Sequence, residues 1–471
     1  VRLGVLSSLH NWGASHIRVR HERGVSHQRV FGPVRSSRSI GEGLPLTYAT
    51  HRTAREFAEH GRKFRIQRGL QRSLEQYSLP DCLRHDGKEE CGCGNLRAWM
   101  LWRCRLRFLL LGFFPGRKAS HAMSHFSEPN SFTKPLFDQL KRHPKRIVFP
   151  EGEDERVLRV AARFVELGLG VPILLGDRDR ISALGKNLGV SMDFVRVIDP
   201  TKSSDFQLFS SRLERIERYR GVVGVDADGV VAKPHYFAAM MVQYGQADAC
   251  LGGNLTEPAG VFRPLLHLIA PDPKVSKVFA VTAMTSDSLA NFGRDGVLFL
   301  ADTGLIPDPE VDDLASIAAE TGMLAYHHMG RRVRVAMLSH SNHGSSRSDS
   351  ALRMVAATAA AREKVSLDEC VIDGEIQLDV ALDPEVVPRK LPAISKNERA
   401  DVLVFPSLDA AHISSKILRH LGGAKCYGKL IRGLTRPAAQ VPRTATEDMI
   451  LGTAAAIGVE AIQYRLLHPK G

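Results

Sequence analysis

Short apolar runs alternate with amphipathic segments through the last three quarters of the chain. One amphipathic segment, residues 155–167, repeats apolar side chains at the spacing of a helix face. The apolar runs have the length of buried strands. They span residues 146–150, 171–175, 247–254, 278–283, 297–300, 333–338 and 402–405. Strands that alternate with helices predict an α/β fold with mostly parallel sheets and flanking helices.

A small, hydroxyl-rich loop follows the run 333–338. It reads Ser-His-Ser-Asn-His-Gly-Ser-Ser over residues 339–346 and leads to a predicted helix at about Asp349. Such a loop offers backbone N–H groups, hydroxyls and a helix N-terminus to an anion. Ser and Gly also fill ordinary strand-to-helix turns, which is the alternative interpretation. We take Ser339, Ser341 and Asn342 as candidate contacts to phosphate.

Nucleotide-binding fingerprints are missing from the sequence. The first strand-helix-strand unit, residues 146–175, lacks the three-glycine dinucleotide turn, and no Walker-type phosphate loop occurs anywhere. A nicotinamide cofactor is therefore not supported. The run 247–254 ends instead in Gly252-Gly253, and the helix predicted after it carries Arg263.

The C-terminal segment offers an arginine and a carboxylate close together. Thr444 and Glu447 have capping-box spacing, which predicts a helix that begins there and ends at about Tyr464. Arg443 would lie just outside the helix N-terminus, where an anion is favoured, and Asp448 one turn inside it. An arginine that neutralises phosphate and a carboxylate that exchanges a proton with a thiol suit acyl transfer.

The excess positive charge is confined to the first quarter of the chain. The whole chain carries +13, and residues 1–122 alone hold 22 basic against 9 acidic side chains. We expect this segment to be no working domain, with Met123 as an alternative start. A basic arm can bind nucleic acid, but this one shows no basic helix or regularly spaced aromatic platform. Its apolar run 108–114 is too short to span a bilayer.

The cysteines predict neither a disulfide framework nor a metal site. Cys82, Cys91, Cys93 and Cys104 fit no common zinc spacing. Cys250, Cys370 and Cys426 stand in or beside apolar runs and are expected to be buried thiols.

Six segments, in order, together resemble the phosphate acetyl/butyryl transferase family. They are RIVFPEGEDERVLRVA (146–161), ADACLGG with the later FRP (247–253, 262–264), VAMLSHSNHGSS (335–346), IDGEIQLDVAL (372–382), VLVFPSLDAAHISSKILR (402–419) and GLTRPAAQVPRTATEDMI (433–450). Several are most similar to the version of this domain found at the C-terminus of bacterial malic enzymes.

The resemblance implies a two-domain architecture like that of isocitrate dehydrogenase, with the site in a cleft between domains. The first domain would be residues 123–271 plus 429–471, and the second 272–428. The resemblance also implies a homodimer that interconverts acetyl-CoA and phosphate with acetyl phosphate and CoA, without a further cofactor or metal. Arg263 and Arg443 would bind the phosphate, Gly253 and Thr444 would line the site, and Asp448 would be the base toward the CoA thiol.

The chain departs from the family pattern at one site position. Members usually carry Ser before the arginine equivalent to Arg443, and this chain has Pro442, which supplies neither a hydroxyl nor an N–H. Thr444 or Thr446 could substitute for the lost donor. A second family arginine is not placed uniquely, because Arg215, Arg218 and Arg220 compete for it.

We therefore expect a cytoplasmic phosphate acyltransferase that binds neither nucleic acid nor a membrane. The alternative, favoured by Pro442, is a CoA-ester or acyl-phosphate binding module with little turnover.

Overall fold

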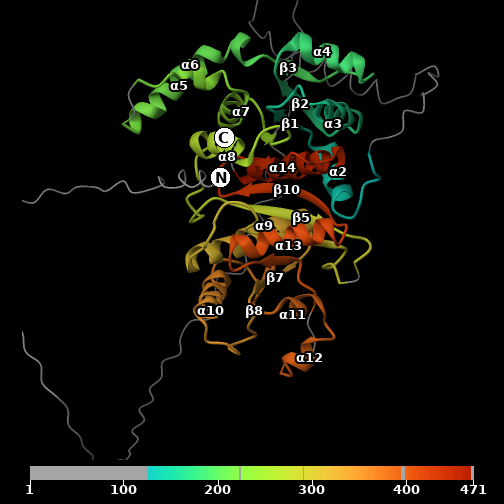
Figure 1. Cartoon of the computed structure of the whole chain (residues 1–471), viewed down its shortest axis with the longest axis vertical. Coiled ribbons are helices and arrows are strands. Elements are labelled where there is room, and N and C mark those ends of the chain that lie inside the picture. Colours follow the sequence, from blue (N-terminus) through green and yellow to red (C-terminus); the bar gives the residue numbers. More distant parts are fainter. Residues whose placement is uncertain (1–125, 222–223, 290, 394–397, 468–471) are drawn as a thin grey trace, which may run out of the picture. The chain divides into compact units, whose positions relative to one another are not determined.

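The computed structural model describes residues 126–221, 224–289, 291–393 and 398–467. Our predictions for residues 1–122, for the start at Met123 and for the first four cysteines lie outside the described residues. The described chain is mixed α/β, with one large sheet flanked by helices (Figure 1). The predicted fold class, with a mostly parallel sheet, is confirmed.

Eleven strands form this sheet in the order β3-β2-β1-β4-β11-β10-β5-β6-β9-β7-β8. Antiparallel pairing is confined to β11 with β10, β10 with β5, and β5 with β6. The strands are β1 (Lys145–Phe149), β2 (Gly170–Leu175), β3 (Arg196–Ile198), β4 (Ala249–Gly252), β5 (Phe279–Thr285), β6 (Val297–Ala301), β7 (Val333–Leu338), β8 (Cys370–Ile376), β9 (Val402–Val404), β10 (Lys425–Arg432) and β11 (Ala438–Gln440).

Helices alternate with strands over much of the chain, as the pattern predicts, although β5 leads directly to β6 and β10 directly to β11. They are α2 (Thr133–Arg142), α3 (Glu155–Glu166), α4 (Arg178–Asn187), the 3-10 turn η1 (Pro200–Lys202), α5 (Phe206–Tyr219), α6 (Ala227–Val231), α7 (Pro234–Gln243), α8 (Pro258–Leu268), α9 (Val311–Met329), α10 (Asp349–Arg362), α11 (Leu378–Leu382), α12 (Val387–Lys390), α13 (Leu408–His420) and α14 (Glu447–Leu467).

The apolar stripe of α3 packs into the core as its spacing predicts. Val157, Leu158, Val160, Ala161 and Phe164 are all fully buried. The helix begins after Asp154, whose side chain accepts a hydrogen bond from the Arg156 N–H, a cap worth about 0.5–2 kcal/mol.

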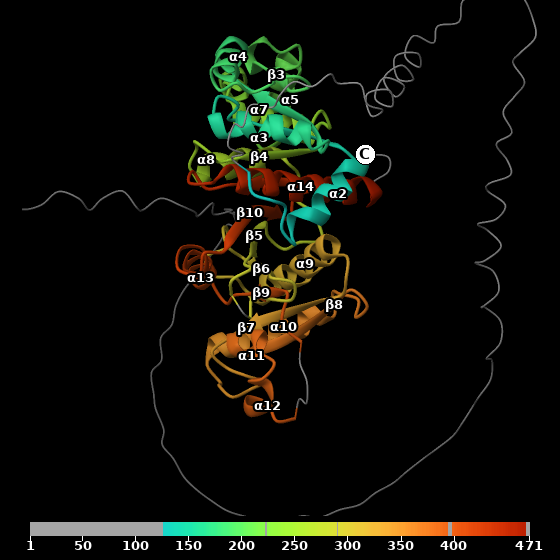
Figure 2. The ribbon, with the colours of Figure 1, turned by 90° about the vertical axis from the view of Figure 1, so that its right-hand side faces the viewer.

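The last residues of the chain return to the middle of the sheet. In Figures 1 and 2, α14 and β10 lie between the strands of the first half and those of the second half. β11 pairs in parallel with β4, and β10 pairs with β5, so this return joins the two halves. The division into two domains at residues 271 and 428 stays a prediction.

Two further observations bear on the class of protein. No helix among the described residues is long and apolar enough to cross a membrane. Cys250, Cys370 and Cys426 are buried free thiols, as predicted. Burial raises the pKa of Cys426 to about 11 and that of Cys370 to about 12, so neither thiol is a ready nucleophile.

Candidate functional site

The segment between β11 and α14 forms a tight turn at the end of β4. The Val441 N–H donates to the Gly252 carbonyl at 2.9 Å, and the Ala445 N–H donates to the Pro442 carbonyl at 2.8 Å. α14 begins only at Glu447, and the Thr446 hydroxyl accepts from the Met449 N–H at 3.4 Å. The predicted helix start at Thr444 was therefore wrong, because the turn after Pro442 takes up that residue and leaves Thr446 as the cap.

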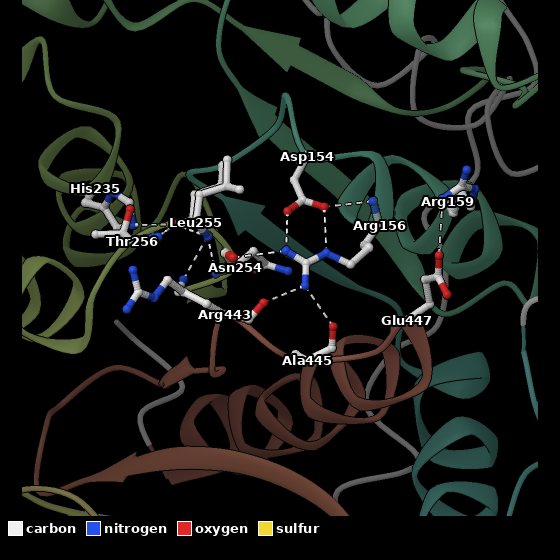
Figure 3. A network of polar contacts seen from close by, with 12 residues as sticks. Asp154, Arg156, Arg159, His235, Asn254, Leu255, Thr256, Arg443, Ala445 and Glu447 are labelled. Carbon is white, nitrogen blue, oxygen red and sulfur yellow. Dashed lines mark hydrogen bonds and ion pairs between the residues drawn. The ribbon is translucent and has the colours of Figure 1, made fainter.

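Arg156 fixes this turn from the side of α3 (Figure 3). Its guanidinium donates to the carbonyls of Arg443 at 2.8 Å and Ala445 at 2.9 Å, and to that of Asn254 at 3.0 Å. Asp154 holds the same guanidinium in an ion pair at 2.6 Å, and this hydrogen-bonded pairing raises the pKa of Arg156. One side chain thus ties the turn that carries Arg443 to the loop after β4.

The loop after β4 wraps around a carboxylate of the chain itself. Glu151 accepts four backbone hydrogen bonds, from the N–H groups of Gly253 at 2.8 Å, Asn254 at 2.6 Å, Leu255 at 3.1 Å and Thr256 at 2.8 Å. Burial acts to raise the pKa of Glu151. The nearby His235 imidazole, 3.6 Å from the carboxylate, and Thr256 outweigh that effect and bring the pKa to about 2. The Gly253 N–H is therefore already used, and a Cβ at this position would lie 2.2 Å from the Val441 carbonyl oxygen.

The two predicted phosphate-binding arginines present their side chains to solvent. Arg443 is 59% exposed, and its one ion pair among the described residues joins it to Glu257 at 3.5 Å. The Arg263 side chain is exposed on α8 and makes no hydrogen bond or ion pair with the residues that the structure describes. An exposed pair such as Arg443 with Glu257 is worth only about 0–1 kcal/mol, so Glu257 holds the guanidinium only weakly.

Of the three competing arginines, Arg220 is tied to the helix that carries Arg263. It donates to the carbonyl of His267 at 2.8 Å and pairs with Glu217 at 3.2 Å. Arg215 and Arg218 make no such contact within the described chain. Which of the three matches the family arginine stays open.

Asp448 is half-buried near the start of α14 and contacts the segment ahead of α2. Its carboxylate accepts from the Ser127 N–H at 2.9 Å and from the Ser127 hydroxyl. No hydrogen bond or ion pair joins Asp448 to Arg443 or Thr444 within the described chain. Their common role in one site stays a prediction.

The loop 339–346 uses its donors internally. Ser341 is fully buried and donates to Glu375 at 2.8 Å, and the Gly344 N–H donates to the same carboxylate oxygen at 2.7 Å. The other N–H groups from residues 341 to 346 donate to Ser339, Ser345, Glu375, Asn342 and Ser341.

Ser339 and Asn342, the other predicted phosphate contacts in this loop, also accept hydrogen bonds from the protein itself. The Asn342 amide oxygen accepts from the Gln377 N–H at 2.7 Å. The anion that this loop holds is therefore the carboxylate of Glu375, and in this conformation the N–H groups of residues 341–346 are not free for another anion. Contacts of Ser339, Ser341 and Asn342 to a substrate stay predictions.

A basic cluster that the sequence did not reveal lies at the end of β6. Lys429 on β10 is half-buried beside Gly304, where an added Cβ would lie 2.9 Å from the lysine Cδ. Burial lowers the pKa of Lys429; Asp302 opposes this effect and Lys416 adds to it. Burial and the charges of Lys429 and Lys416 also lower the pKa of His412. The Lys429 ammonium makes no hydrogen bond with the described residues.

The basic cluster is linked to the turn that carries Arg443. His412, Lys416 and Arg419 recur along α13 at the spacing of one helix face. Arg419 donates to the Thr444 carbonyl at 3.0 Å. Lys429 adjoins Gly304, just after the carboxyl end of β6, and ligands of open α/β sheets bind beyond the carboxyl ends of strands. Among the described residues no group of acidic, His and Cys side chains could hold a metal ion.

Comparisons with known proteins agree on one family. Residues 131–457 match the sequence profile of the phosphate acetyl/butaryl transferase family. The phosphate acetyltransferase of Acetivibrio thermocellus is 32% identical over 336 residues, which cover 71% of this chain and 99% of that relative. The phosphate acetyltransferase of Staphylococcus aureus is 31% identical over 331 residues, 70% of this chain and 98% of the relative.

Solved structures extend the same similarity to the fold. The EutD phosphotransacetylase from Staphylococcus aureus has a TM-score of 0.63 at 30% identity and covers 70% of this chain and 98% of its own. A phosphotransacetylase from Streptococcus pyogenes has the same TM-score, identity and coverage. The match takes in β1, the Glu151 and Arg156 networks and the turn at Arg443. The chain belongs to the phosphate acetyl/butaryl transferase family and is an acyltransferase.

Proposed function

We propose that this chain interconverts acetyl-CoA and phosphate with acetyl phosphate and CoA. The observation that carries the proposal is the state of Arg443. Its backbone is fixed by Arg156, while its guanidinium is exposed and, among the described residues, pairs only with an exposed glutamate. A fixed turn with an available guanidinium suits the binding of a small dianion. Two relatives that align with this chain over 99% and 98% of their own length are named phosphate acetyltransferases.

In the direction of acetyl-CoA synthesis, the reaction begins with the CoA thiol. Asp448 takes the thiol proton, and the thiolate sulfur attacks the carbonyl carbon of acetyl phosphate. A C–S bond forms, the C–O bond to phosphate breaks, and the phosphate leaves onto the cationic groups. Arg443 and Arg263 neutralise this phosphate, and Lys429 adds a third positive charge. In reverse, a phosphate oxygen attacks the thioester carbonyl and Asp448 returns the proton to the thiolate.

Pro442 is expected to lower the rate of this reaction. The position lacks a hydroxyl and an N–H, and loss of one oxyanion donor typically costs about 10²–10³ in rate. The Thr446 hydroxyl accepts at the helix cap, whereas the exposed Thr444 side chain makes no hydrogen bond within the described chain. We take Thr444 as the better substitute donor.

A binding module without turnover is the second candidate, and Pro442 is the observation that favours it. A thiol-release assay on the purified full chain with acetyl-CoA distinguishes the two candidate functions. Release that depends on added phosphate supports the enzyme. Binding of acetyl-CoA without release of thiol, at any phosphate concentration, supports the module.

The remaining expectations extend the same proposal. We expect a homodimer, which light scattering of the purified chain would check, and a cytoplasmic location. We expect binding to neither nucleic acid nor a membrane. The cofactor prediction is that CoA acts as a substrate and that no resident group is required.

A further inference from the structure

The segment ahead of the family domain reaches back onto the predicted base. The family match begins at residue 131, and Ser127 lies four positions before it. Its N–H donates to Asp448 Oδ1 at 2.9 Å and lies 3.2 Å from Oδ2, and its hydroxyl donates to Oδ2. These are the hydrogen bonds that Asp448 makes within the described chain. The contact spans 321 positions in sequence.

Residues 126–130, which we call the strap, are anchored on both sides of Ser127. Phe126 packs against the core, and the Arg163 guanidinium lies 5.9 Å from the centre of its ring. Asn130 caps α2 by accepting from the N–H groups of Phe132 and Thr133.

Asn130 also ties the strap to the middle of the sheet. Its amide nitrogen donates to the hydroxyl of Tyr427 on β10 at 2.7 Å and to that of Thr285 on β5 at 3.2 Å. Phe132 then enters the core, with 1% of its surface exposed. The strap is therefore fixed at both ends, and Ser127 meets Asp448 in a defined place.

Asp448 needs such a partner because of its position. It is the second residue of α14, where the free N–H groups of the first turn attract a carboxylate. A carboxylate that turned back onto its own helix would accept those N–H groups instead. The N–H and the hydroxyl of Ser127 instead hold the carboxylate away from the N–H groups of its own helix. An ionised carboxylate has about four acceptor sites, so others are left to take a proton from a thiol.

We propose that Ser127 is a positioning residue for Asp448, supplied by the strap just ahead of the residues that match the family. The inference rests on the proposed role of Asp448 as the base. It adds that residues ahead of the family match, which begins at residue 131, contribute to the working enzyme.

The test uses three variants of the full chain in the acetyl-CoA-forming assay. Ser127→Ala removes the hydroxyl and keeps the N–H, so kcat should fall about tenfold while the KM values for CoA and acetyl phosphate stay within about twofold. Ser127→Thr keeps a hydroxyl and should restore kcat. Ser131→Ala is the matched control, because Ser131 is exposed and makes no hydrogen bond within the described chain.

A double-mutant cycle then separates the contact from the chemistry. Urea unfolding of the wild type, Ser127→Ala, Asp448→Ala and the double variant should show non-additive losses of stability. Additive losses would overturn the inference, as would an unchanged kcat in Ser127→Ala when the wild type is active. A wild type without turnover would overturn the proposed function, and the inference with it.

Discussion

Glu151→Gln should destabilise the protein in a way that depends on pH. The carboxylate is 8% exposed and accepts N–H groups from four consecutive residues of the loop after β4. A glutamine side chain brings one oxygen and one NH₂ group, so its NH₂ would face backbone donors. The variant removes the negative charge and leaves buried N–H groups without an acceptor.

The pKa of Glu151 sets the size of the effect. Folding lowers this pKa from 4.5 to about 2. A tenfold change in proton affinity corresponds to about 1.4 kcal/mol, so the native environment favours the charged form by roughly 3 kcal/mol. Because the folded pKa lies below the unfolded one, this stabilisation is present above about pH 4.5 and is lost as the pH falls toward 2. About half of it should be gone near pH 3.

Urea unfolding of the wild type and the variant at pH 7 and pH 3 measures this prediction. The difference in free energy of unfolding should be roughly 3 kcal/mol at pH 7 and about half as large at pH 3. Glu166→Gln is the control, because Glu166 is 68% exposed and its pair with Arg163 should contribute about 0–1 kcal/mol. An equal loss at both pH values would refute the argument, and so would a loss no larger than that of the control.

Three further predictions concern the reaction itself. Arg443→Ala should raise the KM for acetyl phosphate by about 10–100-fold and that for CoA much less, and equal increases in steady-state assays would assign Arg443 to structure instead. Pro442→Ser should raise kcat by about tenfold or more, because it places a hydroxyl beside Arg443; an unchanged kcat would show that another donor already serves. Burial lowers the pKa of Lys429, so its charge and the affinity for acetyl phosphate should be lost at a lower pH than for an ordinary lysine. Lys429→Arg should remove that alkaline weakening in KM profiles, and a profile identical to that of the wild type would exclude Lys429 from the site.

The apolar pattern predicted β1, β2 and β4 in the first half and β5, β6, β7 and β9 in the second, because buried strands are near-continuous apolar runs. It missed β3 and β8, which are only partly buried and include polar side chains. The bounds predicted for β7 agree with the structure. β10 was missed because Lys425, Lys429 and Arg432 interrupt its apolar residues, and β11 has only three residues. Both strands depend on pairing with segments far away in sequence, which a local pattern does not contain.

The side-chain contacts of the site were likewise not predictable from the local sequence. The sequence pointed to Arg443 and Asp448 as residues but not to their partners, Arg156 and Ser127, which lie 287 and 321 positions away. The hydroxyl-rich loop 339–346 was interpreted as open to an anion because its acceptor, Glu375, comes from a different strand.

The most direct test of the central claim follows the oxygen atoms of phosphate. The full chain is incubated with acetyl-CoA and phosphate labelled with ¹⁸O at every oxygen, and the acetyl phosphate formed is analysed by mass spectrometry. If a phosphate oxygen attacks the thioester carbonyl, the bridging oxygen comes from phosphate, and the product retains all of the label as free CoA appears in equal amount. Acetyl phosphate that has lost the label from its bridging oxygen would contradict direct attack. Bound acetyl-CoA with no acetyl phosphate formed would contradict the enzyme itself.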